Sequence, residues 1–193
     1  VAAPVGLKRD DVIETAVRLL SSGHRISTLG LKDVAEVLNV KVPSLYAHID
    51  GAPGLRRALA IRSFDETANV VRAATHGRQG IDAFSSALRA YCDFAIGESG
   101  LYEASLVSPV GDDELQRAVA GVTGPFEEVL RSFGLDDEQI VHWLRLVFAS
   151  VYGVASLHRF GHMRASIPSE GTLDLLVHSL ERQLEVMITP ADA

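Results

Sequence analysis

One short segment of the chain concentrates side chains that suit it to bind another molecule. It places four hydrogen-bond donors within eight residues, namely Lys41, Ser44, Tyr46 and His48. Side chains of these types reach the phosphate oxygens and base edges of nucleic acids. The segment therefore predicts a surface that contacts phosphate or bases.

Patterns of enzyme chemistry do not occur in the sequence. Cys92, the only cysteine, has no recognisable His partner, and the sequence has neither Gly-x-Ser-x-Gly nor a P-loop. The acidic pairs at 112–113 and 136–137 stand where helix N-termini favour negative charge. We therefore expect no catalytic residue, no cofactor and no enzyme.

Two histidines have a spacing that can hold a metal ion. His158 and His162 are four residues apart and would share one face of a helix. No cysteine and no third histidine lies near them in the sequence, so we expect exposed or capping histidines and no metal site.

Two short helices are expected to position the four donors. Residues 31–38 have the apolar spacing of a helix that stops at Asn39, and a second helix opens near Pro43. Ala35 lets the two helices approach, Val40 fills the turn, and the rest of the small core is Val34, Leu38 and Leu45. Two helices that cross steeply in this way present the second one to the major groove of DNA.

Apolar spacing is helical along nearly the whole chain, which predicts an all-α fold. We expect a three-helix head with the helix-turn-helix at 1–52 and a helical bundle at 53–193. The other expected helices are 9–22, 53–74 (which links head to bundle), 81–98, 101–107, 113–133, 137–162 and 170–188. Gly23 is expected to stop the first of them.

Charge is distributed unevenly along the chain. Residues 1–62 hold nine Lys or Arg against six Asp or Glu, whereas the remainder holds nine against nineteen. A basic head on an acidic body fits a protein whose first third contacts the phosphates of nucleic acid.

Two features of the sequence favour a location in the cytoplasm, namely the lone cysteine and an N-terminus unlike a signal peptide. The apolar residues 140–157 indicate a buried helix and not a membrane span.

The segment from Leu31 to Ile49 resembles the DNA-binding region of the tetracycline-repressor (TetR) family. The similarity lies in Leu-Lys-Asp-Val-Ala-Glu-Val-Leu-Asn-Val at 31–40 and Ser-Leu-Tyr-Ala-His-Ile at 44–49. It implies a homodimeric, all-helical repressor whose body binds a small ligand and which then releases its DNA operator.

The resemblance assigns DNA contacts residue by residue. Tyr46 and His48 resemble the family's phosphate-contacting pair, Thr28 resembles a phosphate contact, and Ser44 resembles a contact of the recognition helix. The family usually has Phe where this chain has Ile49 and Lys where it has Ala52. The second difference removes a phosphate donor, for which Arg56 or Arg57 would have to compensate.

The C-terminal two-thirds is expected to bind the ligand and a second subunit. Most buried aromatic residues in proteins contribute only to the packing of the core. The residues that could instead line a ligand pocket are Tyr91, Phe94, Tyr102, Phe126, Trp143, Phe148, Tyr152 and His158. Two apolar stripes suggest the dimer interface, with Val147, Val151 and Val154 on one helix and Leu173, Leu176, Leu180 and Leu184 on the other.

Two other interpretations remain open. One is a small-molecule-binding protein of the same fold without DNA recognition, for which Ala52 is the only indication, and the weaker one is a helical enzyme. The sequence does not identify the ligand, the operator or target genes, or whether the chain represses or activates.

Overall fold

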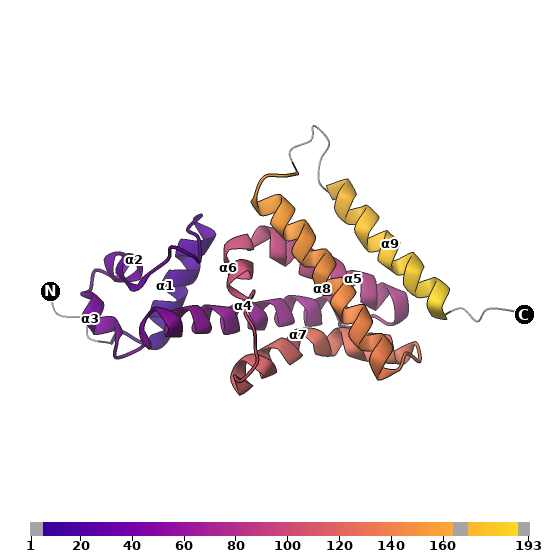
Figure 1. The fold of residues 1–193 in the computed structure, drawn as a ribbon, viewed down its shortest axis with the longest axis horizontal. Coiled ribbons are helices and arrows are strands. Elements are labelled where there is room, and N and C mark those ends of the chain that lie inside the picture. The colour runs from indigo at the N-terminus through magenta and orange to yellow at the C-terminus, as the bar shows by residue number, and fades with distance from the viewer. Residues whose placement is uncertain (1–5, 164–169, 189–193) are drawn as a thin grey trace, which may run out of the picture. The chain divides into compact units, whose positions relative to one another are not determined.

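The computed structural model describes residues 6–163 and 170–188, which form helices joined by turns and loops and contain no strand (Figure 1). The all-α prediction is therefore confirmed. The chain forms two compact units. The head unit takes the chain up to Phe64 together with Glu98–Gln116, and the body unit takes Asp65–Gly97 together with the chain from Arg117.

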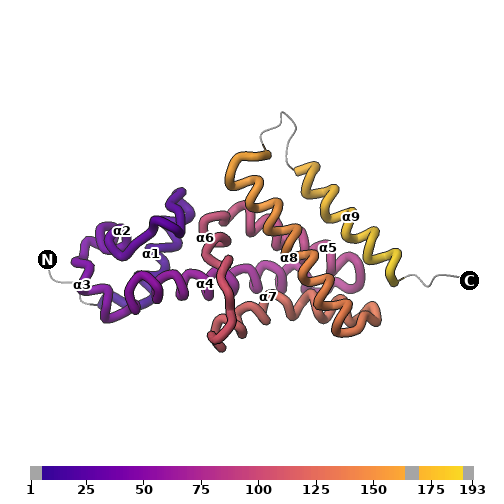
Figure 2. The backbone as a smooth tube through the Cα atoms, in the orientation of Figure 1, coloured from indigo at the N-terminus to yellow at the C-terminus, as the bar shows by residue number. Residues whose placement is uncertain are grey.

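The head unit contains the first three helices, the start of the fourth and one later helix. These are α1 (Arg9–Ser21), α2 (Leu31–Val37), α3 (Val42–Leu45), the first half of α4 (Gly51–Thr75) and α6 (Ser99–Ala104). Figure 2 traces the backbone from α1 through α2 and α3 into α4. Within the unit, α2 packs against α1 and α3, and α6 packs against α1.

The body unit contains the rest of α4 and the long C-terminal helices. These are α5 (Gly80–Gly97), α7 (Asp113–Ser132, which opens at the end of the head segment), α8 (Asp137–Arg159) and α9 (Glu170–Ile188). Helix α5 packs against both α8 and α9. The helix α8 is long and apolar enough to cross a membrane by length and composition, with a mean hydropathy of 1.5. Its buried residues, among them Trp143, Val147 and Val151, lie in the core of the body unit.

Most helix ends agree with the sequence prediction, and glycine determines two of them. After α1, Gly23 has a φ of 103°, and the amide of His24 donates to the carbonyl of Leu19 at 3.1 Å. After α8, Gly161 has a φ of 70°, and the amide of His162 donates to the carbonyl of Leu157 at 2.8 Å. Both are the left-handed ends that glycine favours.

The end of α8 corrects two expectations. The helix was expected to reach residue 162, but it ends at Arg159 because Gly161 reverses the backbone. His162 therefore lies outside the helix and does not share a helical face with His158. Among the described residues, no group of three or more His, Cys, Asp or Glu side chains is placed to hold a metal ion.

Helices α4 and α6 also differ from the expected ranges. α4 begins at Gly51, two residues before the expected start at Pro53, and α6 ends at Ala104 instead of residue 107. Near the end of α6, the hydroxyl of Ser105 donates to the carbonyl of Tyr102 at 2.7 Å, which competes with continuation of the helix.

Candidate nucleic-acid interface

The scaffold of the helix-turn-helix matches the packing that the sequence predicts. Val34, Ala35 and Leu45 are buried, and Leu45 has 0% of its surface exposed. Ile49, which stands where the resembled family usually has Phe, is also buried. Because Ile49 is an apolar core residue that follows α3, the replacement of Phe by Ile keeps a buried apolar side chain at this position.

The turn between α2 and α3 depends on Asn39, which has a φ of 53°. The amide of Asn39 donates to the carbonyl of Glu36 at 3.1 Å, and the amide of Val40 donates to the carbonyl of Ala35 at 2.9 Å. These two bonds satisfy carbonyls in the last turn of α2, those of Glu36 and Ala35. Asn is the residue that most often replaces glycine in this conformation. The turn therefore ends α2 sharply and directs the chain into α3.

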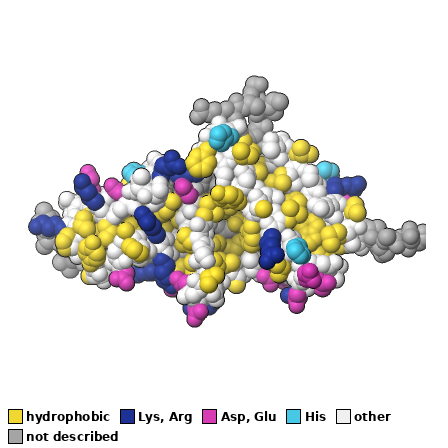
Figure 3. All heavy atoms as spheres, in the orientation of Figure 1, with side chains coloured by type: hydrophobic (Ala, Val, Ile, Leu, Met, Phe, Trp, Pro, Cys, Tyr) yellow, Lys and Arg dark blue, Asp and Glu magenta, His cyan; other side chains and the backbone are white. Residues whose placement is uncertain are grey.

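The donors predicted to bind DNA lie on the outside of this scaffold. Tyr46 is 61% exposed although its neighbour Leu45 is fully buried, and Lys41 is exposed at the start of α3. Ser44 and His48 are half-buried. The structure thus brings these four side chains onto one short stretch of the head unit, and Lys and Arg side chains stand on the face of the head drawn in Figure 3.

Thr28 precedes the first helix of the motif and is exposed. Its hydroxyl oxygen Oγ1 donates to the carbonyl of Arg25 at 3.3 Å. A hydroxyl retains lone pairs while it donates, and it can rotate to donate to a phosphate oxygen instead.

Arg56 and Arg57 differ in a way that the sequence does not reveal. Arg56 is exposed, whereas the guanidinium of Arg57 binds two carboxylates. Its Nε lies 2.5 Å from Oδ2 of Asp112, and its Nη2 lies 2.8 Å from Oε2 of Glu114. These bonds raise the pKa of Arg57 and keep it charged. The guanidinium of Arg57 is therefore bound by carboxylates within the head unit, whereas Arg56 is exposed.

The segment 98–116 is a part of the head that sequence reasoning missed. A Cβ placed on Gly100 would lie 2.6 Å from the carbonyl oxygen of Leu20, so α6 contacts the backbone at the end of α1. The hydroxyl of Ser21 also donates to Oε2 of Glu98 at 2.8 Å. Tyr102, expected in a ligand pocket of the body, is buried in the head unit instead. The only indication of the contact with α1 in the sequence is a glycine, Gly100, within a short helix.

The other ligand candidates divide into buried and exposed residues. Phe84 joins two of them, because it packs edge-on against Phe126 at 6.2 Å and against Trp143 at 5.9 Å between ring centroids. Tyr91 and Phe148 form another edge-on pair at 5.8 Å, and Phe94 is buried. Tyr152 and His158 lie exposed on α8.

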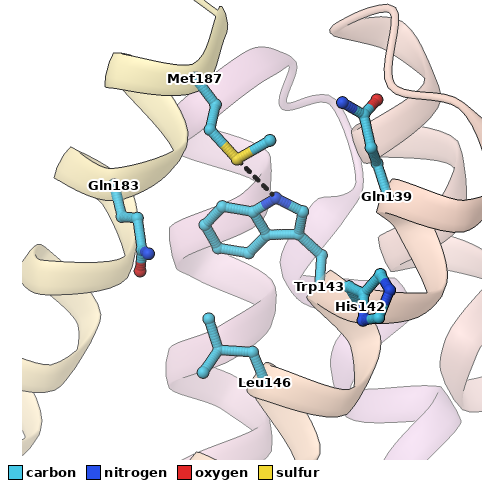
Figure 4. A pocket seen from close by; sticks show the side chains of 6 residues that line it. All are labelled: Gln139, His142, Trp143, Leu146, Gln183 and Met187. Atoms are coloured by element: carbon cyan, nitrogen blue, oxygen red, sulfur yellow. Dashed lines mark hydrogen bonds between the residues drawn. The ribbon is translucent and has the colours of Figure 1, made fainter.

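Two hollows in the body unit could admit a small molecule. One, of about 290 Å³, lies between α8 and α9 and includes a single residue of the predicted set, Trp143 (Figure 4). The other, of about 500 Å³, contains none of that set and is lined by Thr75, Arg78, Gln79, Gly80, Pro125, Glu128, Val129, Ser132 and Phe133.

The residues predicted for the dimer interface lie inside the body unit. Val147, Val151 and Leu184 have no exposed surface, and Val154, Leu173 and Leu180 are also buried, with Leu176 half-buried. They are core residues of one subunit, since both stripes turn toward the unit's own helices. The large apolar residues that α8 and α9 leave exposed are Val141, Leu146, Tyr152, Leu157, Leu175, Val186 and Met187.

Comparisons with known proteins agree with this architecture. A family described as "Tetracyclin repressor-like, C-terminal domain" matches residues 84–180. The HTH-type transcriptional regulator Rv0681 of Mycobacterium tuberculosis is 33% identical over 165 residues, which cover 84% of this chain and 75% of the relative. The HTH-type transcriptional regulator YobS of Bacillus subtilis is 31% identical over 103 residues, or 53% of each chain.

A solved structure shows the same fold at lower identity. The crystal structure of TetR from Acinetobacter baumannii AYE superposes with a TM-score of 0.68 and 18% identity, covering 94% of this chain and 98% of that one. The chain belongs to the TetR family, and it is a DNA-binding transcriptional regulator.

Proposed function

We propose that this regulator binds its operator as a homodimer, through the head unit, and releases it when a small molecule binds the body unit. The proposed DNA contacts are Thr28, Lys41, Ser44, Tyr46, His48 and Arg56. The observation that supports them best is the contrast between two neighbours, Leu45 at 0% exposed and Tyr46 at 61%. A buried anchor next to an exposed donor fixes the orientation of that donor for phosphate.

Binding to DNA can be tested with the intergenic region upstream of the chain's own gene. We expect the association constant to fall steeply between two salt concentrations, because phosphate contacts release counterions. A chain that kept the fold but lost DNA recognition would show no salt-dependent binding, and that result would reject the proposal.

Two variants test the assigned contacts. Tyr46→Phe and His48→Ala each remove a hydrogen-bonding group, and each should weaken binding to all sequences by about three- to tenfold. His76→Ala, which removes the same imidazole from an exposed histidine just after α4, is the matched control for His48→Ala and should not change binding. A change only in operator preference would contradict the assignment to phosphate.

The proposed dimer uses the exposed faces of α8 and α9. Apolar side chains are visible on the body surface in Figure 3, and α8 also carries the small residues Ala149, Ser150, Gly153 and Ser156 on accessible or half-buried positions. Small side chains allow a second helix to approach closely. A twofold dimer also matches a palindromic operator.

Gly153 provides the test of this surface. A Cβ on Gly153 meets nothing within 4 Å in the described subunit, so Gly153→Leu should fold but reduce dimerisation, as measured by light scattering at micromolar concentration. Gly97→Leu is the control, because Gly97 also has open space and lies at the end of α5. A monomeric mass for the unaltered chain would contradict the proposal.

The body unit is proposed to bind and not to catalyse. Within the described residues, Cys92 is buried and no cluster of His, Cys, Asp or Glu is placed to hold a metal ion. A regulator that binds chromosomal DNA would act in the bacterial cytoplasm, and release of the operator by a ligand would make it a repressor. Addition of an effector that left operator affinity unchanged would reject the ligand response but not DNA binding.

A further inference from the structure

The outer side of the recognition helix α3 is apolar. Leu45 anchors this helix in the core of the head unit with 0% of its surface exposed, whereas Pro43 and Ala47 are both exposed. A helix turns by about 100° per residue, so the positions two residues before and two residues after Leu45 lie opposite its buried side. Pro43 and Ala47 therefore form the ridge of α3 that points most directly away from the core.

The helical path continues beyond Leu45, which places Ala47 on this ridge. Tyr46 has helical backbone angles, with a φ of −65° and a ψ of −18°. The amide of Ile49 donates to the carbonyl of Leu45 at 2.9 Å, which is the bond of an α-helical turn. Pro43 has no backbone N–H, but in the first turn of a helix that group would have no partner within the helix. The two side chains of the ridge thus lie one above the other, four residues apart.

The recognition segment lacks the side chains that bind most bases by hydrogen bonds. Residues 42–49 are Val-Pro-Ser-Leu-Tyr-Ala-His-Ile, without Arg, Lys, Asn, Gln, Asp or Glu. Arg and Lys are the usual partners of guanine, Asn and Gln those of adenine, and Asp and Glu those of cytosine. Thymine instead presents a C5-methyl group in the major groove, and apolar side chains contact that group. A ridge of Pro and Ala therefore suits thymine.

The polar side chains of α3 and the turn after it lie on the two flanks of the ridge. By the same helical geometry, Tyr46 lies on one flank, and Ser44 and His48 lie on the other. Tyr46 is 61% exposed, and the other two are half-buried. Phosphates border the major groove on both sides, so side chains on both flanks can reach the DNA backbone while the ridge faces the base edges.

We propose that Pro43 and Ala47 determine the operator specificity of this regulator by contact with the C5-methyl groups of thymines in the major groove. The proposal rests on the DNA contacts proposed for the head unit, and it adds the base that the ridge recognises. Both side chains are short, so the backbone of α3 can approach the base edges closely. The contact buries apolar surface and requires no hydrogen bond, and it therefore distinguishes thymine from uracil, which lacks only the methyl group.

Selection of duplexes from a random DNA library by the full chain tests which bases are recognised. We expect every half-site of the selected DNA to contain a thymine at a fixed position. The selected duplex is then synthesised with uracil in place of each thymine in turn. At the recognised positions, we expect uracil to weaken binding by about three- to tenfold, because apolar contact with the methyl group is lost. The slope of log K against log salt should not change, since no phosphate contact is lost.

Matched variants assign the methyl contact to the ridge. Ala47→Gly removes the methyl group of the protein, so the ratio of the dissociation constants for the uracil and thymine duplexes should fall toward one. Ala73→Gly, at an exposed alanine of α4 in the body unit, is the control and should keep the ratio of the unaltered chain. Pro43→Ser is the second variant on the ridge and should also lower the ratio. Circular dichroism checks that each variant is folded.

Three results would overturn the proposal. They are selected half-sites without a fixed thymine, equal affinity for the thymine and uracil duplexes, or a ratio that Ala47→Gly and Pro43→Ser both leave unchanged. In each case salt-dependent binding to DNA would persist, so the proposed phosphate contacts of the head unit would stand. Loss of salt-dependent binding to every duplex would instead reject those contacts, and the recognition of thymine with them.

Discussion

Arg57 binds both carboxylate oxygens of Asp112, with Nε 2.5 Å from Oδ2 and Nη2 2.8 Å from Oδ1. Asp112 also accepts the backbone N–H of Leu115 at 3.0 Å through Oδ1, so it caps the first turn of α7. One carboxylate therefore joins α4, which follows directly after the recognition helix, to the start of α7. The whole arrangement lies within the head unit.

The acid stability of the chain should depend on this pair. The hydrogen bond from Arg57, followed by that from the Leu115 amide, lowers the pKa of Asp112 from 3.8 to about 2. Since the folded-state pKa lies below the unfolded one, the resulting stability is fully present above about pH 4 and is lost as the pH falls toward 2. The free energy of unfolding in urea, measured from pH 5 to pH 2, should decrease less steeply in Asp112→Asn.

The side chain of Asn can still cap α7, so this substitution removes the charge and keeps the cap. Asp65→Asn is the control, because the side chain of Asp65 is exposed and forms no hydrogen bond or ion pair with another described side chain. Equal pH profiles for Asp112→Asn and the unaltered chain would contradict the prediction.

Arg56 and Arg57 should affect DNA binding differently. Arg56→Ala should reduce the salt dependence of operator binding by about one unit in the slope of log K against log salt, because one phosphate contact is lost. Arg57→Ala should leave that slope unchanged, since two carboxylates already neutralise this guanidinium. Titrations at several salt concentrations compare the two. If Arg57→Ala alone changed the slope, the roles would be reversed.

The turn of the helix-turn-helix should tolerate glycine but not a β-branched residue at position 39. Asn39→Gly should change the free energy of unfolding by less than about 0.5 kcal/mol, because glycine adopts a φ of 53° without strain. Asn39→Val should lower it by about 1–2 kcal/mol, since a β-branched side chain resists this conformation. Urea unfolding measures both, and a neutral effect of valine would show that the turn has another conformation.

Contact between α1 and α6 should make Gly100 intolerant of a larger side chain. Gly100→Ala would place a methyl group 2.6 Å from the backbone oxygen of Leu20. Because α1 or α6 would have to move to accommodate this methyl group, we expect the free energy of unfolding to fall by about 1–3 kcal/mol. Gly97→Ala, at the end of α5 with open space around its Cβ position, should be neutral or stabilising by up to about 1 kcal/mol. Equal thermal midpoints for the two variants would contradict this contact.

Cys92 should be inert in the folded chain. Burial raises the pKa of its thiol from 9.0 to about 11, so the thiolate that reacts with disulfide reagents is scarce at neutral pH. Because the folded-state pKa exceeds the unfolded one, this group stabilises the fold below about pH 9 and loses that effect as the pH rises toward 11. A chromogenic disulfide reagent should react rapidly only after denaturation, and fast reaction of the native chain would refute the prediction.

Local features of the head and the helices could be predicted from the sequence. Apolar spacing gave the helices within a few residues, and the buried positions Val34, Ala35 and Leu45 followed from the same spacing. Gly23 and Asn39 marked helix ends because left-handed backbone favours these residue types. Each of these properties depends on neighbours within about one or two helical turns.

Other properties depended on residues that are distant in the sequence. Nothing near Arg57 indicates Asp112, 55 residues away, and nothing near Leu20 indicates Gly100. The stripes of α8 and α9 showed correctly that one face of each helix is buried, but a stripe does not reveal whether its own subunit or a second one covers it. Periodicity thus determined the helices and the recognition motif, whereas only the tertiary structure decided which partner each side chain meets, because folding brings distant segments together.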